Sequence, residues 1–269
     1  MATILADAPA VDFLRYFAPS SADRGSLIVT VFGGSGYRGR RHFEIAERLS
    51  SNGYHCVMVN PRDRNAAADT RAATRNLSEV IRMAVEQTEA SRVGIYGRCG
   101  GGRLTLFYLR DYPINPVDSV LFWGMPGRFS QLDLLEITER MRKAGYETAE
   151  DQIDTTDAVD VLDGLKIRAL ICGGLEDHTS FLPKGNIEPQ VTLFERLVRA
   201  GQIPLLSVLI FSGAPQAIDD MEQSAFEAFC TTMLNWFDLT LRMASRRASE
   251  GATVSPSGCL KPDGSLLGT

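Results

Sequence analysis

The chain has 269 residues, of which 44% are hydrophobic and 23% are charged. This balance is typical of a folded protein and excludes a disordered chain, a collagen-like chain and a small disulfide-stapled scaffold. The formal net charge is −5, and the 28 lysines and arginines are spread along the sequence. The electrostatic footprint of a nucleic-acid-binding protein is therefore missing, and we expect a small-molecule partner with no role for nucleic acid.

The sequence also gives expectations about location and metals. No stretch approaches the roughly 20 apolar residues of a membrane-spanning helix, and residues 1–20 lack the pattern of a secretion signal. We accordingly expect a cytoplasmic protein that does not bind membranes. The five cysteines form no C-x-x-C pair, so neither a disulfide framework nor a metal site is predicted.

Six short apolar runs rich in β-branched residues predict strands. They cover residues 26–32, 54–60, 92–96, 117–123, 167–173 and 205–211. Helical periodicity appears between the runs, as in Leu77, Val80, Ile81 and Ala84 at positions i, i+3, i+4 and i+7. This alternation predicts a doubly wound α/β domain with a mostly parallel sheet, which binds ligands at the carboxyl ends of its strands.

Two segments depart from the alternation. Residues 126–160 form a long polar and acidic stretch that we expect to act as a short cap over the strand ends. After Met243 the composition changes to Ser, Arg, Gly and Pro, which predicts a disordered tail over residues 244–269. The expected organisation is one domain over residues 1–243, with the cap inside it.

The strongest chemical signature is Gly97-Arg98-Cys99-Gly100-Gly101, which reads G-x-C-x-G between a predicted strand and a predicted helix. This pattern is typical of a nucleophile elbow, a sharp turn that presents its central side chain while glycines allow close backbone approach. Cys99 is therefore the candidate nucleophile.

With this elbow, the chain resembles the α/β-hydrolase family over about residues 26–241, and in particular its dienelactone-hydrolase-like and prolyl-oligopeptidase-like members. Residues 29–36 look like the strand and glycine loop whose backbone N–H groups help to form the family's oxyanion hole. The resemblance implies that Gly34, Ser35 and Gly100 donate to a developing oxyanion. Residues 170–177 look like the strand and loop that supply the catalytic acid, which makes Asp177 the match.

The resemblance fails at the family's catalytic histidine. The matching text after the last strand is G-A-P-Q over residues 213–216, so Gln216 stands where the family has His. A glutamine amide does not take the proton of a thiol at neutral pH, and Gln216 is left as a polar orienting group. Among the three histidines, His178 is a candidate substitute base, while His42 and His55 are assigned structural positions.

A cysteine can act as a nucleophile without a general base, because a helix N-terminus and nearby cations favour its thiolate. Arg98 and Arg103 supply such cations, and Tyr37 in the glycine loop is a further candidate for a polar contact. We therefore interpret the chain as an enzyme that uses Cys99 for acyl transfer or (thio)ester cleavage on a small acyl compound. The sequence implies no organic cofactor and leaves the oligomeric state open, a homo-oligomer included.

Two other interpretations stay open. Gln216 in the base position fits a catalytically silent or non-hydrolytic protein of this fold, which binds a ligand or promotes cyclisation or elimination. Residues 34–39 also satisfy G-x-G-x-x-G, with Arg62 and Arg64 placed to hold a 2′-phosphate, which fits an NADP-linked reductase that resembles short-chain dehydrogenases. Against the reductase, the chain contains no Tyr-x-x-x-Lys pair.

Overall fold

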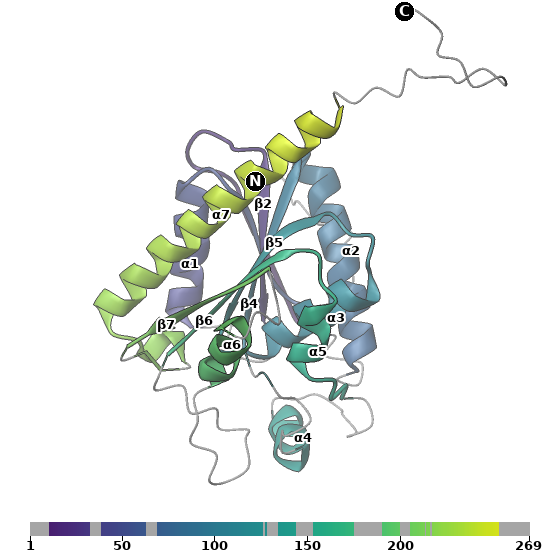
Figure 1. Ribbon diagram of the computed structural model, residues 1–269, viewed down its shortest axis with the longest axis vertical. Helices are drawn as coiled ribbons and strands as arrows, with labels where there is room; N and C mark the ends of the chain where they lie inside the picture. The colour runs from purple at the N-terminus through teal and green to yellow at the C-terminus, as the bar shows by residue number, and fades with distance from the viewer. Residues whose placement is uncertain are drawn as a thin grey trace, which may run out of the picture.

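Seven strands form one sheet at the centre of the molecule (Figure 1). The computed structural model describes residues 11–32, 39–62, 69–125, 127, 134–143, 153–174, 190–199, 205–212, 214–215 and 217–252. The strands are β1 (Phe13–Phe17), β2 (Ser26–Phe32), β3 (His55–Asn60), β4 (Arg92–Arg98), β5 (Val117–Trp123), β6 (Arg168–Gly174) and β7 (Leu206–Phe211). Their order is β1-β3-β2-β4-β5-β6-β7. Strand β1 runs antiparallel to β3, and the remaining neighbours run parallel.

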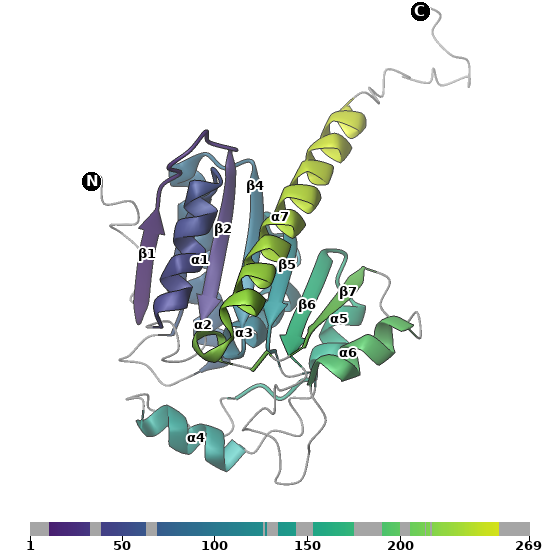
Figure 2. The same ribbon diagram turned by 90° about the vertical axis from the view of Figure 1, so that its left-hand side faces the viewer.

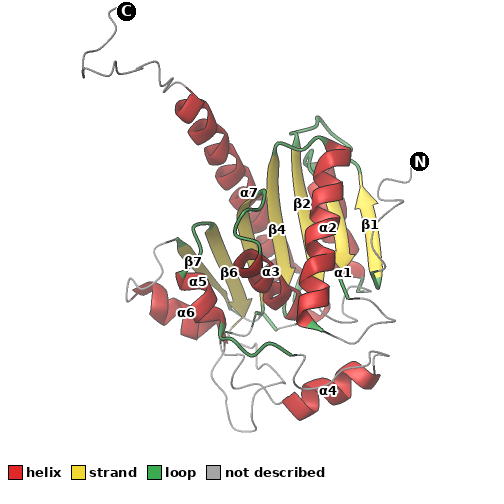
Figure 3. Ribbon diagram, turned by 90° about the vertical axis from the view of Figure 1, so that its right-hand side faces the viewer, coloured by secondary structure: helices red, strands yellow, loops and turns green. Residues whose placement is uncertain are grey.

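Helices cover both faces of the sheet. One face carries α1 (Arg40–Ser51) and α7 (Gln223–Ala252), as Figure 2 shows. The other face, turned to the viewer in Figure 3, carries α2 (Thr70–Thr88), α3 (Gly100–Asp111), α5 (Ala158–Asp163) and α6 (Gln190–Arg199). Helix α4 (Leu134–Lys143) lies beyond the carboxyl ends of the strands, within the segment expected to form the cap. Within the described residues, no helix has both the length and the apolar character needed to cross a membrane.

The core consists of two apolar layers, one on each side of the sheet. In β2, Leu27, Val29 and Val31 enter the layer under α2 and α3, whereas Ile28 and Phe32 enter the layer under α1 and α7. All seven residues of β2 are buried. A parallel strand covered on both faces reads as a continuous apolar run, which is why the sequence identified it.

The six predicted strands are confirmed. The structure differs from the prediction in three places. Strand β4 runs on to Arg98, so it leads directly into the predicted elbow. The short edge strand β1 was missing from the prediction, since its half-buried sequence carries no continuous apolar run. Helix α7 continues through residues 244–252, within the segment predicted as a tail, because Ala, Arg and Glu favour helix there. Residues 253–269 lie outside the described part of the chain.

The strand order bears on the reductase interpretation. In the classic dinucleotide-binding order 3-2-1-4-5-6, a third parallel strand lies beyond the second. Here the strand beyond β3 is β1, which precedes β2 in the sequence and runs antiparallel. The topology therefore departs from the arrangement that the reductase interpretation requires.

Helix α3 approaches the sheet closely enough to exclude side chains at two glycines. A Cβ at Gly101 would lie 2.0 Å from the carbonyl oxygen of Val31, the penultimate residue of β2. A Cβ at Gly97, at the end of β4, would lie 2.8 Å from the Cα of Gly102. These glycines let the helix begin directly against the strand ends, which sets the position of the elbow between them.

Substituting Gly101 tests this packing. We expect Gly101→Ala to lower the free energy of unfolding by about 1–3 kcal/mol, since the backbone of Val31 has no room to yield. The matched control is Gly164→Ala, where the nearest heavy atom to a new Cβ is 3.7 Å away. Urea unfolding followed by circular dichroism measures both variants. Equal stability of the two would show that the contact at Gly101 imposes no constraint.

Candidate functional site

Cys99 forms a strained turn between β4 and α3. Its backbone angles are φ 47° and ψ −118°, in a region that residues with a side chain rarely adopt. The Cys99 amide donates to the carbonyl oxygen of Trp123 at 2.9 Å, and its own carbonyl accepts from the amide of Arg103 at 3.3 Å. Hydrogen bonds to β5 and α3 thus hold Cys99 in this strained conformation. A strained turn from strand to helix is thus present where the sequence predicted one.

Cys99 differs from the other described cysteines in its exposure. It is half-buried, whereas Cys56, Cys172 and Cys230 are buried. Burial raises the pKa of each of these three thiols well above its ordinary value. Cys99 instead precedes the first turn of α3, which contains no acidic residue, and so lies at the positive end of the helix dipole.

The neighbouring Arg98 contacts a buried histidine. The Arg98 Nη1 and the His42 Nε2 are 3.2 Å apart. His42, in the first turn of α1, is 1% exposed, and its ring meets the Phe32 ring edge-to-face with centroids 4.9 Å apart. Burial, assisted by the charge of Arg98, lowers the pKa of His42 to about 3. The imidazole is therefore neutral at physiological pH.

The ends of β6 and β7 meet closely. A Cβ at Gly174, the last residue of β6, would lie 1.5 Å from the carbonyl oxygen of Ala214, just after β7. Farther along, Arg41 of α1 donates through Nη1 to the carbonyl oxygen of Ile218 at 2.8 Å. The Arg41 amide also donates to the Asp219 carboxylate at 3.1 Å. These contacts fix the chain after β7 against α1.

The described residues include four members of the predicted site. Arg98, Cys99 and Gly100 lie together at the elbow, and Arg103 lies one turn farther along α3. The other six members lie outside the described residues: Gly34, Ser35, Tyr37, Asp177, His178 and Gln216. The described strands β2, β6 and β7 end at the same carboxyl edge of the sheet as β4. Phe32, which ends β2, pairs in register with Arg98, so the glycine loop leaves the sheet beside the elbow.

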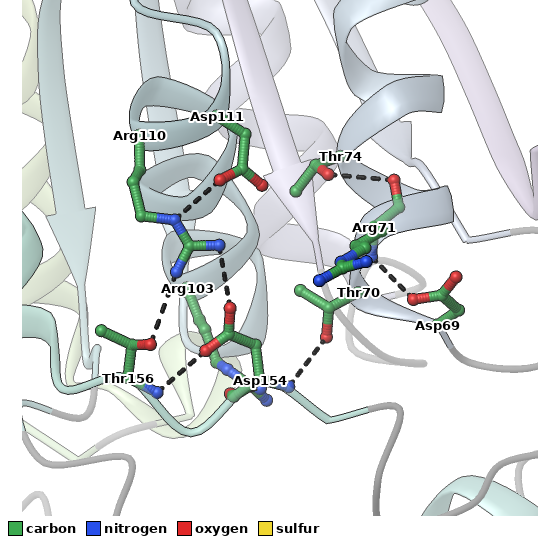
Figure 4. Close-up of polar contacts among 9 residues, drawn as sticks. All are labelled: Asp69, Thr70, Arg71, Thr74, Arg103, Arg110, Asp111, Asp154 and Thr156. Carbon is green, nitrogen blue, oxygen red and sulfur yellow. Dashed lines mark hydrogen bonds and ion pairs between the residues drawn. The ribbon is translucent and has the colours of Figure 1, made fainter.

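Arg103 belongs to a polar cluster that the sequence did not reveal (Figure 4). Its guanidinium is buried and donates to the backbone carbonyl of Asp154. The Asp154 amide donates to the Thr70 hydroxyl at 3.3 Å, and the Asp154 carboxylate lies 2.8 Å from the Arg110 guanidinium. Asp154 therefore connects the chain that precedes α5 to α2 and α3. Nothing in the acidic stretch distinguished Asp154 from its neighbours, because its partners are distant in sequence.

The comparisons with known proteins agree with this architecture. No family model matches the chain, and no curated protein is significantly similar in sequence. A dienelactone hydrolase from Anabaena variabilis matches with a TM-score of 0.58 and 17% identity, over 85% of this chain and 91% of that one. An esterase from Exiguobacterium antarcticum matches with a TM-score of 0.59 and 16% identity, over 84% and 95%. A bromoperoxidase from Bacillus anthracis matches with a TM-score of 0.55 and 16% identity, over 84% and 94%.

The fold is that of the α/β-hydrolases. The predicted fold class, a doubly wound and mostly parallel sheet, is confirmed. At identities of 16–17%, the similarity extends to the fold and not to individual catalytic residues.

Selective alkylation tests the exposure of the elbow thiol. We expect iodoacetamide to modify Cys99 in the native protein and to leave Cys56, Cys172 and Cys230 unmodified, because those three are buried with raised pKa values. Peptide mass spectrometry after a timed quench measures each site. Labelling in urea is the control, where all three should react. Native labelling of a buried cysteine at the rate of Cys99 would contradict the assignment.

A variant at Asp154 tests the polar cluster. Burial alone would raise the pKa of Asp154, but hydrogen bonds from Thr156 and the charge of Arg110 outweigh it and lower that pKa below 3.8. The ionised carboxylate thus stabilises the fold above its ordinary pKa, and this contribution is lost as the pH falls. We expect Asp154→Asn to cost about 1 kcal/mol at neutral pH and less in acid.

The matched control for Asp154→Asn is Asp163→Asn, at the exposed last residue of α5. We expect this change to leave the free energy of unfolding close to that of the wild type. Urea unfolding at several pH values measures all three proteins. A cost of Asp154→Asn that stays constant with pH would contradict a role for the ionised carboxylate.

Proposed function

We propose that this chain is an α/β-hydrolase-fold enzyme that uses Cys99 as a nucleophile in acyl transfer or (thio)ester cleavage on a small acyl compound. The observation that carries the proposal is the backbone of Cys99, strained at φ 47° on the turn from β4 into α3. Strain of this kind persists where the surrounding structure enforces it, and it is common at active sites. Here it places a half-buried thiol at the carboxyl edge of the sheet.

The first step is attack by the Cys99 thiolate on the acyl carbon. A sulfur–carbon bond forms, the bond from that carbon to the alkoxide or thiolate leaving group breaks, and the leaving group takes a proton from solvent. No base is needed to remove a proton from sulfur when the thiol is already ionised. The N-terminus of α3 and the Arg98 guanidinium favour that ionisation.

The negative oxygen of the intermediate requires hydrogen-bond donors. The Gly100 amide at the start of α3 is one candidate, and it is half-buried. Backbone N–H groups of Gly34 and Ser35 are the others, as the family resemblance implies. We assign Asp177 to the acid position and Gln216 to polar orientation of the substrate, with Tyr37 as an additional contact.

In the second step, an acceptor takes the acyl group from sulfur. The acceptor's oxygen, nitrogen or sulfur bonds to the acyl carbon, the sulfur–carbon bond breaks, Cys99 leaves as a thiolate, and the acceptor loses its proton to solvent. Water is a weak acceptor without a general base, and Gln216 does not serve as one. His178 is the candidate substitute base, and as a base it would activate water and favour hydrolysis. We therefore favour transfer to a nucleophile stronger than water over simple ester hydrolysis.

The fold comparisons support the choice of substrate class. The matching structures include proteins named as an esterase and as a dienelactone hydrolase. Both names refer to cleavage of an ester or a lactone, which are acyl compounds. This support concerns the type of reaction, and the particular acyl group depends on the cap and the walls of the site.

A covalent adduct tests the proposal. We expect the wild-type protein, mixed with an acyl thioester or an activated ester, to gain the mass of the acyl group on Cys99. Cys99→Ala should abolish the adduct, and Cys230→Ala, which alters a buried cysteine, should retain it. Intact-protein and peptide mass spectrometry give the readout. No adduct across a panel of acyl groups would refute the nucleophile and favour the ligand-binding interpretation that Gln216 left open.

A further inference from the structure

The contact between Arg98 and His42 has a defined polarity. A guanidinium has donors and no acceptor, so the His42 Nε2 must accept the hydrogen bond at 3.2 Å. The imidazole is then neutral, with its proton on Nδ1. This agrees with the pKa of His42, which burial and the charge of Arg98 lower to about 3. Within the described residues, the buried Nδ1 has no hydrogen-bond partner.

The pair lies at the edge of the sheet where the elbow begins. Arg98 ends β4 and pairs in register with Phe32, which ends β2. His42 packs on the Phe32 ring with centroids 4.9 Å apart. Cys99 follows Arg98 in the chain, with adjacent Cα atoms about 3.8 Å apart. His42 therefore contacts the side chain next to the candidate nucleophile, although it comes from a helix that begins far earlier in the sequence.

The charge of Arg98 is not neutralised by this contact. Within the described residues, Arg98 makes no ion pair, and the group it contacts is uncharged. An aspartate or glutamate in place of His42 would hold the guanidinium equally well but would cancel its charge. A neutral acceptor holds the guanidinium and leaves its field intact, which matters for a thiol one residue away.

Charged groups from neighbouring elements also face this edge within the described residues. The Asp219 carboxylate, after β7, accepts from the Arg41 amide of α1. On α3, the Arg103 guanidinium donates to the carbonyl oxygen of Asp154. Tyr96 shares a face of β4 with Arg98, and burial raises its pKa. The remaining titratable groups near Tyr96 are the buried thiols of β6 and α7, Cys172 and Cys230.

We propose that His42 is a positioning residue: as a neutral acceptor it fixes the Arg98 guanidinium beside the elbow with its charge intact, and that charge favours the Cys99 thiolate. The inference deepens the proposed function, because it assigns the source of the ionisation on which the covalent step relies. It also changes the interpretation of His42 from a packing residue to one that acts through Arg98.

The experiment measures the rate of Cys99 alkylation by iodoacetamide across a pH series, which gives the pKa of the thiol. We expect Arg98→Gln to raise the pKa of the Cys99 thiol. At pH values below that pKa, the variant should be alkylated roughly three- to tenfold more slowly than the wild type. His42→Phe should raise the pKa in the same direction and by less, since the guanidinium stays but is no longer fixed. His42→Gln supplies an amide oxygen that accepts the hydrogen bond from Arg98 in place of the imidazole nitrogen. This variant should recover much of the wild-type profile.

Two controls separate positioning from general damage. The double variant His42→Phe with Arg98→Gln should match Arg98→Gln alone, because His42 acts through Arg98. His55→Gln should leave the Cys99 profile unchanged, since His55 lies on β3 and contacts Tyr16 and Asp23. Circular dichroism confirms that each variant is folded, and His42→Leu, which also lacks an acceptor, replaces His42→Phe if the latter is not.

The outcomes are distinct. An unchanged profile in both His42 variants, with a shift in Arg98→Gln, overturns the role of His42. An unchanged profile in Arg98→Gln overturns the role of the guanidinium. If the wild type forms no acyl adduct while the His42 variants still shift the alkylation profile, the inference stands and the proposed acyl chemistry fails.

Discussion

The backbone of Cys99 is the constraint on which the site depends. A left-handed conformation at a residue with a side chain has to be enforced from outside, and here β5 and α3 do so through hydrogen bonds to both ends of the residue. Glycines on either side let the helix begin against β2 without a collision. The strand, the turn and the helix are thus a single rigid unit, and the thiol is placed by the packing of the sheet itself.

Arginine side chains are held at this edge mainly by neutral acceptors. Arg41 donates to backbone carbonyl groups after β7, Arg98 to an imidazole and Arg103 to the carbonyl of Asp154. A neutral acceptor orients a guanidinium through a hydrogen bond and does not neutralise its positive charge. Three guanidinium groups thus lie at this edge of a chain whose formal net charge is −5.

The sequence predicted most of the sheet because parallel strands buried on both faces read as uninterrupted apolar runs. It did not reveal β1, whose residues are half-buried at the edge. The elbow was predictable from glycine spacing, since its geometry is local. The pairing of His42 with Arg98 and the cluster around Asp154 were not, because each joins residues far apart in the chain. The roles of Asp177 and Gln216 remain predictions that no described contact tests.

The attachment of the cap has an evolutionary consequence. The Ala158 amide donates to the carbonyl oxygen of Gly127 at 3.0 Å, so the two ends of the inserted segment meet, and Asp154 secures its exit. A loop whose ends are already joined can lengthen at a small entropic cost. Related chains can thus gain or lose residues between these ends while the turn at Cys99 keeps its place.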